Sequence, residues 1–257
     1  MSVAILITLC SKNQDWKKIE DIDFIVHCLD SLISTRSGKY NFNYYLGYDE
    51  NDEFFVNNID LLKKRLSMFY FLELPKKCNG NPCLAWTLLY EKALECEKNE
   101  YFYQLGSDIL HLVKGWDEYF IDIMKKHDND CIVGGVETMQ WINRTIQGQS
   151  GILENVFTGR KHYERFGWFF PPEVKSWYSD DLITKVYRNV NKCFIATNIK
   201  FKNTNRVGDE NELSRYKPPT DKPIAKNWDK VANKYSAMGF KELGINETIF
   251  NKVNKFN

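Results

Sequence analysis

The chain has 257 residues, of which 43% are hydrophobic and 15% aromatic, and its formal net charge is +1. This length and hydrophobic content are enough for a substantial buried core, so the composition indicates a globular protein. A net charge this close to zero argues against a nucleic-acid partner held by bulk electrostatics.

The charge is unevenly distributed along the chain. Residues 185–257 contain 15 Lys or Arg against 7 Asp or Glu, so the rest of the chain is acidic. A basic C-terminal third could help to hold a polyanionic ligand such as a pyrophosphate, or contact an acidic partner or lipid. A solvated lysine-rich surface explains the same pattern equally well.

The cysteines and the N-terminal residues indicate the compartment. The seven cysteines include no Cys-x-x-Cys pair and lie mostly in apolar runs, which is typical of reduced, buried thiols. Residues 1–9 are apolar but lack a basic n-region, and no later run approaches the roughly 20 residues that span a bilayer. We therefore expect a cytoplasmic protein with no transmembrane segment.

Apolar runs alternate with amphipathic patterns through the first part of the chain. Continuous apolar or aromatic runs predict strands, and apolar residues at helical spacing predict helices. In chain order we expect a strand at 3–9, a helix at 16–34, strands at 44–48 and 68–74 separated by a helix at 59–66, a helix at 84–94, and an aromatic strand from Tyr101. This alternation predicts a Rossmann-like α/β fold with a mainly parallel sheet and helices on both faces.

The carboxyl ends of the predicted strands carry polar residues and glycines. In open α/β sheets this edge is where ligands bind. The residues concerned are Thr8, Asp49, Gly80 and Asn81 in the loop before the helix at 84–94, and the turn Gly106, Ser107, Asp108. We therefore expect a ligand crevice at this edge.

The second half of the chain has a less regular pattern. We expect a helix at 116–126, strands at 131–136, 152–157 and 192–201, a helix at 177–187, a polar loop at 202–223 and a helix at 225–238. There is no internal repeat and no low-complexity linker, so one domain covering 1–257 is the predicted organisation.

The order of these features resembles a known family. The quoted segments are Cys28-Leu-Asp-Ser-Leu32, the strand-end Asp49, Asn79-Gly-Asn-Pro82, Tyr101-Phe-Tyr-Gln-Leu-Gly-Ser-Asp108, His162-Tyr-Glu-Arg-Phe-Gly-Trp-Phe-Phe-Pro171 and Trp177-Tyr-Ser-Asp-Asp181. Together they look like GT-A-fold glycosyltransferases of the family 2 type, and are similar to glycosyltransferases of large DNA viruses and protists. The resemblance covers residues 3 to 216. It implies a nucleotide-binding half at 1–138 and an acceptor half, with the basic C-terminal segment, at 139–257.

The resemblance also implies roles for individual residues. Asp108 would hold Mn²⁺ or Mg²⁺ and the pyrophosphate of a nucleotide sugar, since hard cations prefer oxygen ligands. Asp181 or Asp180 would take the proton from the acceptor hydroxyl in an inverting transfer. Asp49 would bind the uracil or ribose, with Thr8, Gly80, Asn81, Gly106 and Ser107 as further nucleotide-binding residues and Arg160, His162 and Trp168 as acceptor or phosphate contacts.

The sequence departs from the family pattern at the metal motif. The usual motif is Asp-x-Asp or an Asp-Asp pair, whereas here Gly106 and Ser107 precede a single Asp108. One carboxylate binds such a cation weakly unless substrate phosphates complete the shell. Three accounts stay open: metal held by Asp108 with the pyrophosphate, transfer without metal assisted by the basic C-terminal third, or a degenerate enzyme.

Each of these residues also has a purely structural interpretation. Asp108 could cap a helix that begins at Ile109. Asp180 and Asp181 could stabilise the N-terminus of their helix through its macrodipole. Asp49 could be an acidic turn residue, a single buried histidine such as His162 is usually structural, and basic residues such as Arg160, Arg206, Arg215 and Lys217 are usually solvated.

The sequence thus predicts a nucleotide-sugar-dependent glycosyltransferase, with a UDP-sugar favoured as donor and a glycan or protein as acceptor. It would act in the cytoplasm, or in the host cytoplasm or virion if viral. The alternative is a catalytically degenerate nucleotide- or glycan-binding module of the same fold. A nucleotidyltransferase is a third possibility, although Cys10-Ser-Lys-Asn-Gln14 after the first strand lacks the glycines usual there.

Overall fold

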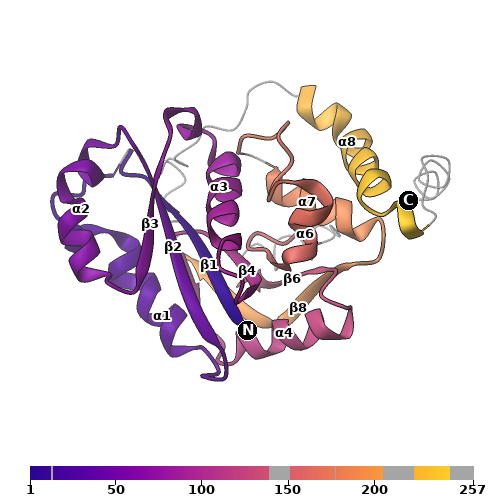
Figure 1. The fold of residues 1–257 in the computed structure, drawn as a ribbon, viewed down its shortest axis with the longest axis horizontal. Coiled ribbons are helices and arrows are strands. Elements are labelled where there is room, and N and C mark those ends of the chain that lie inside the picture. The colour runs from indigo at the N-terminus through magenta and orange to yellow at the C-terminus, as the bar shows by residue number, and fades with distance from the viewer. Residues whose placement is uncertain (13, 139–150, 177, 205–222, 244–257) are drawn as a thin grey trace.

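The computed structural model describes residues 1–12, 14–138, 151–176, 178–204 and 223–243 (Figure 1). The basic residues Arg206, Arg215 and Lys217, which are candidates for phosphate contacts from the sequence, lie outside this part of the chain. Among the described residues, no helix combines the length and the apolar character that a membrane crossing requires.

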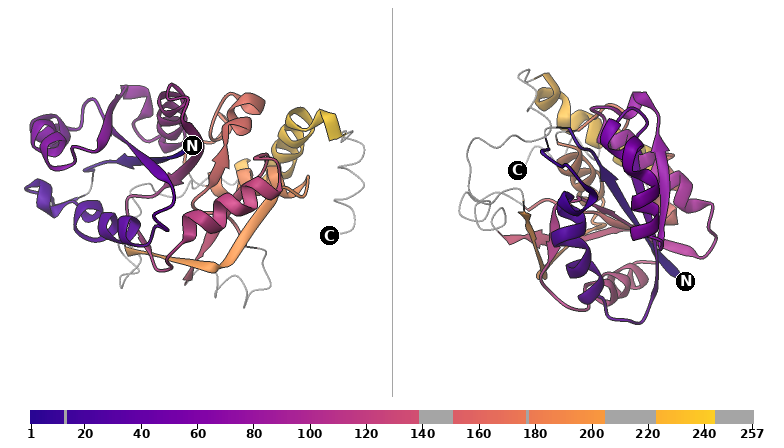
Figure 2. Two further views of the ribbon diagram at one scale, coloured as in Figure 1. Left: turned by 60° about the horizontal axis from the view of Figure 1, so that its bottom comes forward. Right: turned by 90° about the vertical axis from the view of Figure 1, so that its left-hand side faces the viewer.

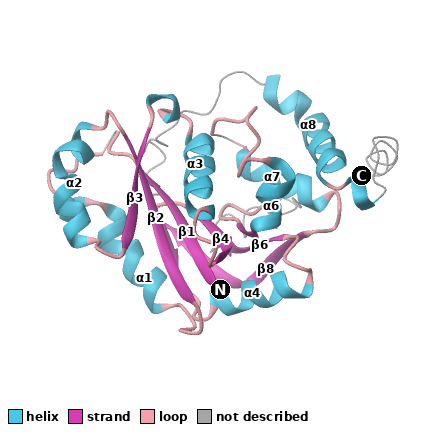
Figure 3. Ribbon diagram, viewed as in Figure 1, coloured by secondary structure: helices cyan, strands magenta, loops and turns pink. Residues whose placement is uncertain are grey.

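The described residues form an eight-stranded sheet in the order β3-β2-β1-β4-β7-β6-β8-β5 (Figure 3). The strands are β1 Ser2–Leu9, β2 Asn41–Asp49, β3 Phe69–Leu74, β4 Asn99–Leu105, β5 Ile109–His111, β6 Ile132–Glu137, β7 Phe157–Gly159 and β8 Cys193–Asn203. Neighbours among β1 to β4 are parallel, as are β6 and β8, whereas β7 and β5 run antiparallel to theirs. The predicted mainly parallel α/β sheet is confirmed.

Helices cover both faces of the sheet (Figure 1, Figure 2). The α-helices are α1 Leu29–Ser34, α2 Glu53–Arg65, α3 Pro82–Leu94, α4 Trp116–Lys126, α6 Arg160–Phe166, α7 Ser179–Arg188 and α8 Pro223–Gly239, with a π-turn at Phe24–Cys28 and 3₁₀ turns at Ile19–Asp21, Lys76–Cys78 and Lys241–Leu243. α1, α2 and α4 pack on one face, and α3, α6, α7 and α8 pack on the other.

Strand β1 shows why the chain folds around its first residues. Residues 3–7 are completely buried. Side chains alternate across a strand, so Val3, Ile5 and Ile7 join the core under α1, α2 and α4, while Ala4 and Leu6 join the core under α3 and α7. A strand buried on both faces needs the continuous apolar run that the sequence provides.

Two predicted helix starts were wrong. The helix expected at 16–34 is helical only from Phe24, after the separate 3₁₀ turn Ile19–Asp21. The helix expected from residue 59 begins at Glu53, because the side chain of Asp52 accepts a hydrogen bond from Phe55 N and caps it. Capping chemistry rather than apolar spacing sets that start.

Two further predicted elements also differ. The strand expected at 152–157 is only β7, Phe157–Gly159. Before it, Val156 bonds to the backbone and the side chain of Gln104 in β4, and Leu153 bonds to the side chain of Thr184 in α7. The helix that Asp108 could have capped does not form. Ile109–His111 is instead the short strand β5, which pairs antiparallel with β8.

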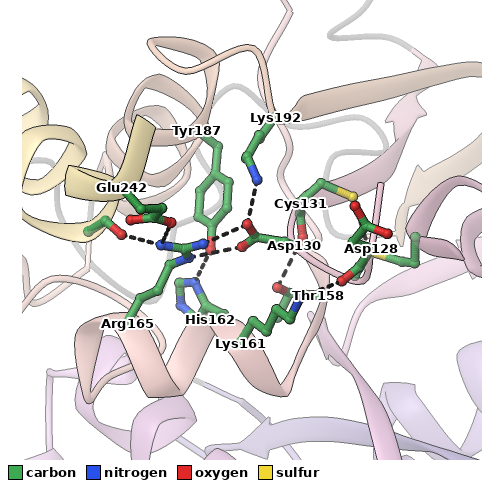
Figure 4. A network of polar contacts seen from close by, with 12 residues as sticks. Asp128, Asp130, Cys131, Thr158, Lys161, His162, Arg165, Tyr187, Lys192 and Glu242 are labelled. Atoms are coloured by element: carbon green, nitrogen blue, oxygen red, sulfur yellow. Dashed lines mark hydrogen bonds and ion pairs between the residues drawn. The ribbon is translucent and has the colours of Figure 1, made fainter. Parts of the chain in front are cut away.

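A cluster of charged side chains ties the amino ends of β6 and β8 to the C-terminal elements (Figure 4). Asp130, immediately before β6, accepts hydrogen bonds from Arg165 of α6 (Nε to Oδ1 2.9 Å, Nη2 to Oδ2 2.6 Å) and forms an ion pair with Lys192. Arg165 also pairs with Glu242. Because Asp130 is only 7% exposed, its charge depends on these two cations.

We predict that Asp130→Asn lowers the free energy of unfolding by about 2 kcal/mol at pH 7, because it removes the buried anion that Arg165 and Lys192 share. Burial alone would raise the pKa of Asp130, but hydrogen bonds from Arg165 and Lys192 outweigh it and lower the pKa. The carboxylate therefore stabilises the fold above its unfolded pKa, and this contribution is lost as the pH falls through the lowered folded pKa.

Denaturant titrations at several pH values measure this effect. The difference between wild type and Asp130→Asn should shrink below about pH 4. Asp15→Asn, which removes an exposed ion pair with Lys17, is the control and should leave stability unchanged at every pH. A constant difference between wild type and Asp130→Asn across the titration would contradict the assignment.

Candidate functional site

Three of the predicted segments meet at the carboxyl edge of the sheet. Thr8 is the second-last residue of β1 and lies opposite Gly47 of β2, whose last residue is Asp49. The turn that begins at Gly106 follows β4 directly, on the other side of β1. Because these strands are parallel and adjacent, their ends share one edge.

The loop after β1 is fixed beside Asp49 by a residue that the sequence analysis did not select. The carboxylate of Asp52 accepts hydrogen bonds from Ser11 N (2.8 Å) and Ser11 Oγ (2.6 Å) while it caps α2. Burial raises the pKa of Asp49, and the charges of Asp52 and Glu50 raise it further. An Asp directly before an acidic first turn is an N-cap signal that could have identified Asp52.

Gly80 and Asn81 form the turn that leads into α3. Gly80 has φ of +71°, a left-handed conformation that favours glycine. The side chain of Asn81 accepts a hydrogen bond from Leu84 N (3.2 Å) and caps α3, with Pro82 as the first helical residue. The amide oxygen of Asn81 therefore has a structural role as the N-cap of α3.

The Asp108 turn is held at both of its ends. Gly106 N donates a hydrogen bond to Asn155 Oδ1 (3.1 Å), and Asp108 O accepts from both N and Oγ1 of Thr204 (2.8 and 3.1 Å). A Cβ on Gly106 would lie 2.7 Å from Asp108 Oδ1, so the carboxylate folds closely over the glycine. A larger residue at 106 would displace that carboxylate.

This turn offers oxygen ligands for a divalent cation. Asp108 supplies a carboxylate and the neighbouring Ser107 a hydroxyl, both of which suit Mg²⁺ or Mn²⁺. Within the described ranges, no three or more His, Cys, Asp or Glu side chains come together as a metal cluster. The residues therefore fit a cation whose remaining ligands come from phosphate oxygens of a bound nucleotide.

The acid pair of the second half lies close to the start of α3. Asp180 and Asp181 occupy the first turn of α7, and Asp180 Oδ1 accepts a hydrogen bond from Asp181 N (3.0 Å). Burial raises the pKa of the Cys83 thiol to about 12; a hydrogen bond with Ser179 opposes this shift and the charge of Asp180 adds to it. The positions of Asp180 and Asp181 also fit a purely structural role, since carboxylates in the first turn stabilise a helix N-terminus.

The remaining predicted residues lie elsewhere. Arg160 donates hydrogen bonds to Asn99 O (2.7 Å), Cys96 O (2.7 Å) and Leu94 O (3.2 Å), at the amino end of β4. The structure thus holds this guanidinium at the opposite edge from the Asp108 turn, in hydrogen bonds to three backbone carbonyls.

His162 and Trp168 belong to the core under α3 and α7. His162 Nδ1 lies 2.7 Å from Tyr187 Oη (Figure 4). Its Nε2 lies 2.9 Å from Phe169 O. Burial lowers the pKa of His162 to about 4, so the ring is neutral at pH 7. Trp168 stacks on Phe166 and is only 9% exposed. Packing explains both residues.

Two further polar residues at the carboxyl edge were missed. Asn155 contacts the start of the Asp108 turn, and Glu137, the last residue of β6, is 4% exposed and accepts a hydrogen bond from Asn203 N (3.5 Å). Glu137 could have been found as a carboxylate at a strand end. Asn155 has no comparable signal in the sequence, since it is singled out only by its contact with Gly106, which lies 49 residues earlier in the chain.

No protein-family model matches the chain, and no curated protein matches its sequence. Solved structures do match. S. aureus TarS 1–349 in complex with UDP gives a TM-score of 0.58 at 12% identity, over 98% of this chain and 69% of that one. The complex of the same TarS segment with UDP-GlcNAc gives 0.57 at 14%, over 98% and 70%.

A third match comes from another organism. Mannosyltransferase PcManGT from Pyrobaculum calidifontis, in complex with GDP-Man and Mn²⁺, gives a TM-score of 0.56 at 12% identity, over 94% of this chain and 63% of that one. The fold is that of GT-A glycosyltransferases. The chain spans 37% of the longer TarS structure. The shared fold therefore does not by itself assign the activity of TarS to this chain.

We predict that Asn81→Ala lowers the free energy of unfolding by about 1 kcal/mol through loss of the α3 cap, whereas Asn81→Asp keeps the cap and the stability. Denaturant titration measures this difference. Asn79→Ala, at an exposed neighbouring position, is the matched control. Equal stability of Asn81→Ala and wild type would show that the cap contributes nothing.

Proposed function

We propose that the protein is a glycosyltransferase that moves a sugar from a nucleotide-sugar donor to an acceptor hydroxyl. The observation that carries this proposal is the meeting of Asp49 and the Asp108 turn at one edge of a GT-A sheet, with the pair Asp180 and Asp181 near the start of α3. The fold similarity to proteins bound to UDP, UDP-GlcNAc and GDP-Man supports the same ligand class. We favour a UDP-sugar.

The proposed reaction is a single displacement that inverts the anomeric centre. The acceptor hydroxyl oxygen bonds to the anomeric carbon, the bond from that carbon to the diphosphate breaks, and the nucleoside diphosphate leaves with the electron pair. The hydroxyl proton passes to the carboxylate of Asp181 or Asp180. Asp49 binds the uracil or ribose, and the polar residues beside it, including Thr8, line the nucleotide site.

Asp108 and Ser107 would hold the divalent cation. When bound, Mn²⁺ or Mg²⁺ neutralises charge on the leaving diphosphate. The single carboxylate makes this binding dependent on the nucleotide, because phosphate oxygens must complete the ligand set. Metal and nucleotide are therefore expected to bind together rather than separately.

The remaining features of the proposal rest on the sequence. Residues 1–138 would bind the nucleotide, and 139–257 would bind a glycan or protein acceptor. The buried thiols of Cys28, Cys78, Cys83 and Cys131 suit a cytoplasmic protein. The resemblance to viral glycosyltransferases supports a viral source.

A second candidate function is a nucleotide- or glycan-binding module without activity. Gly106 and Ser107 favour it, because the family pattern, Asp-x-Asp or Asp-Asp, has a second acid at one of these two positions. The acid pair at 180 and 181 favours the enzyme, since a binding module has no need of a proton acceptor. Calorimetry of UDP with and without Mn²⁺, followed by a donor-hydrolysis assay, separates the two functions.

We predict that UDP-sugars raise the thermal midpoint when Mn²⁺ is present, because a ligand that binds only the native state stabilises it. Asp108→Asn should abolish this shift while keeping the ligand-free midpoint, since the amide lacks the negative charge that the cation needs. A thermal-shift screen of UDP-, GDP- and dTDP-sugars measures both. Asp122→Asn, at an exposed position on α4, is the control.

Two results would count against this part of the proposal. If no nucleotide sugar shifts the midpoint at millimolar concentration, the protein does not bind the proposed donors. If Asp108→Asn responds as wild type does, the cation is held elsewhere or is not used.

We predict that Asp181→Asn or Asp180→Asn lowers the transfer rate by about 100-fold or more and leaves UDP binding unchanged, because loss of a general base affects the chemical step. Transfer rate and UDP affinity are measured on the same samples. The control is Asp229→Asn in α8, which removes an exposed ion pair to Lys185 of α7, the helix that carries the acid pair. Loss of UDP affinity in both acid-pair variants would indicate a structural role.

A further inference from the structure

Residues 153–156, which we call the brace, connect the carboxyl end of β4 with helix α7. Val156 O accepts a hydrogen bond from Gln104 N (2.9 Å), and Val156 N donates to Gln104 Oε1 (3.1 Å). Leu153 N donates to Thr184 Oγ1 of α7 (3.0 Å). These contacts are buried, so the brace holds the end of β4 and the middle of α7 at a fixed separation.

Asn155 is the brace residue that reaches the Asp108 turn. Its side-chain oxygen accepts the hydrogen bond of Gly106 N (3.1 Å), and the residue is 2% exposed. Because a backbone N–H can only donate, this contact assigns Oδ1 to the side of Gly106. In the described part of the chain, Asn155 Nδ2 then has no hydrogen-bond partner, so the contact to Gly106 is the one that orients the side chain.

The backbone of Asn155 is equally constrained. Its carbonyl oxygen packs so closely on Gly134 of β6 that a Cβ there would lie 2.5 Å from it. On the other side, the carboxylate of Asp108 folds over Gly106, the residue that Asn155 holds. The position of the Asp108 carboxylate therefore depends on Gly106, and the position of Gly106 depends on Asn155.

We propose that Asn155 is a positioning residue for the metal–diphosphate site: its Oδ1 fixes Gly106, so that the Asp108 carboxylate is presented to the cation and the diphosphate. This inference rests on the proposed function. The hydrogen bond from Leu153 to Thr184 also ties the brace to α7. The brace therefore fixes the position of the Asp108 turn relative to α7, whose N-terminal end carries Asp180 and Asp181.

The test compares Asn155→Ala with Asn155→Asp in the full chain. Alanine removes the acceptor for Gly106 N, whereas the near-isosteric Asp keeps it. In the ligand-free protein, the amide of Gly106 should exchange hydrogen faster in the Ala variant and as slowly as wild type in the Asp variant. This measurement tests the contact itself and needs neither nucleotide nor metal.

The second measurement is the Mn²⁺ concentration that gives half-maximal UDP binding in calorimetry. It should rise about fivefold in Asn155→Ala, as expected for loss of one neutral hydrogen bond that orders a ligand, and should not rise in Asn155→Asp, which keeps the acceptor. Asn189→Ala removes side-chain hydrogen bonds to Asn233 and Ser236 between α7 and α8, and should leave this concentration unchanged even if stability falls.

Two outcomes overturn the inference. One is a wild-type Mn²⁺ requirement in Asn155→Ala despite faster exchange at Gly106, and the other is an equal defect in Asn155→Asp. If Asn155→Ala does not fold, Asn155→Ser, whose shorter side chain cannot reach Gly106, replaces it in both measurements. A wild-type protein that binds no UDP with Mn²⁺ would instead overturn the proposed function, while the exchange at Gly106 would still decide whether Asn155 holds the turn.

Discussion

The close approach of chain segments at Gly106 is the constraint on which the candidate site depends. Strand β4 ends next to β1 in the sheet, and the residue that follows must leave room for the carboxylate of Asp108 and offer its N–H to Asn155. Only a glycine satisfies the first condition without moving the carboxylate. Close packing around Gly106 therefore sets the position of the Asp108 carboxylate at the carboxyl edge. The conformation of the turn does not require a second acid.

The two edges of the sheet have different tasks. At the amino edge, charged and polar groups are buried in satisfied networks: Asp130 binds Arg165 and Lys192, and Arg160 binds three backbone carbonyls. Such pairs hold α6 and the C-terminal elements against the sheet (Figure 4). At the carboxyl edge, Asp49 and the Asp108 turn place carboxylates at the ends of neighbouring parallel strands. In the proposed function, a cation bound with a nucleotide would offset part of this negative charge.

The brace connects the Asp108 turn to the second half of the chain. The proposed transfer would require a donor site and a proton acceptor, which come from distant parts of the sequence, to be held at a fixed distance. Here residues 153–156 bond to β4 on one side and to α7 on the other. Such a link uses backbone groups and the side chains of Gln104, Asn155 and Thr184, none of which is chemically reactive. Residues of this type determine geometry rather than reactivity.

The sequence by itself determined the sheet and the main edge of the site. The apolar run 3–9 is long enough only for a strand buried on both faces, and strand-end residues such as Asp49 and Asp108 share an edge in any parallel sheet. Tertiary structure decided the rest. Arg160 and His162 have the residue types of a phosphate site, yet Arg160 bonds to Asn99 O at the amino edge of the sheet and His162 lies buried beside Tyr187. Asn155 shows the converse, because no local pattern marks a residue whose importance comes from one contact to Gly106 across the sheet. Periodicity and strand ends are local properties of a sequence, whereas the partner of a buried polar group is set by the packing of the whole chain.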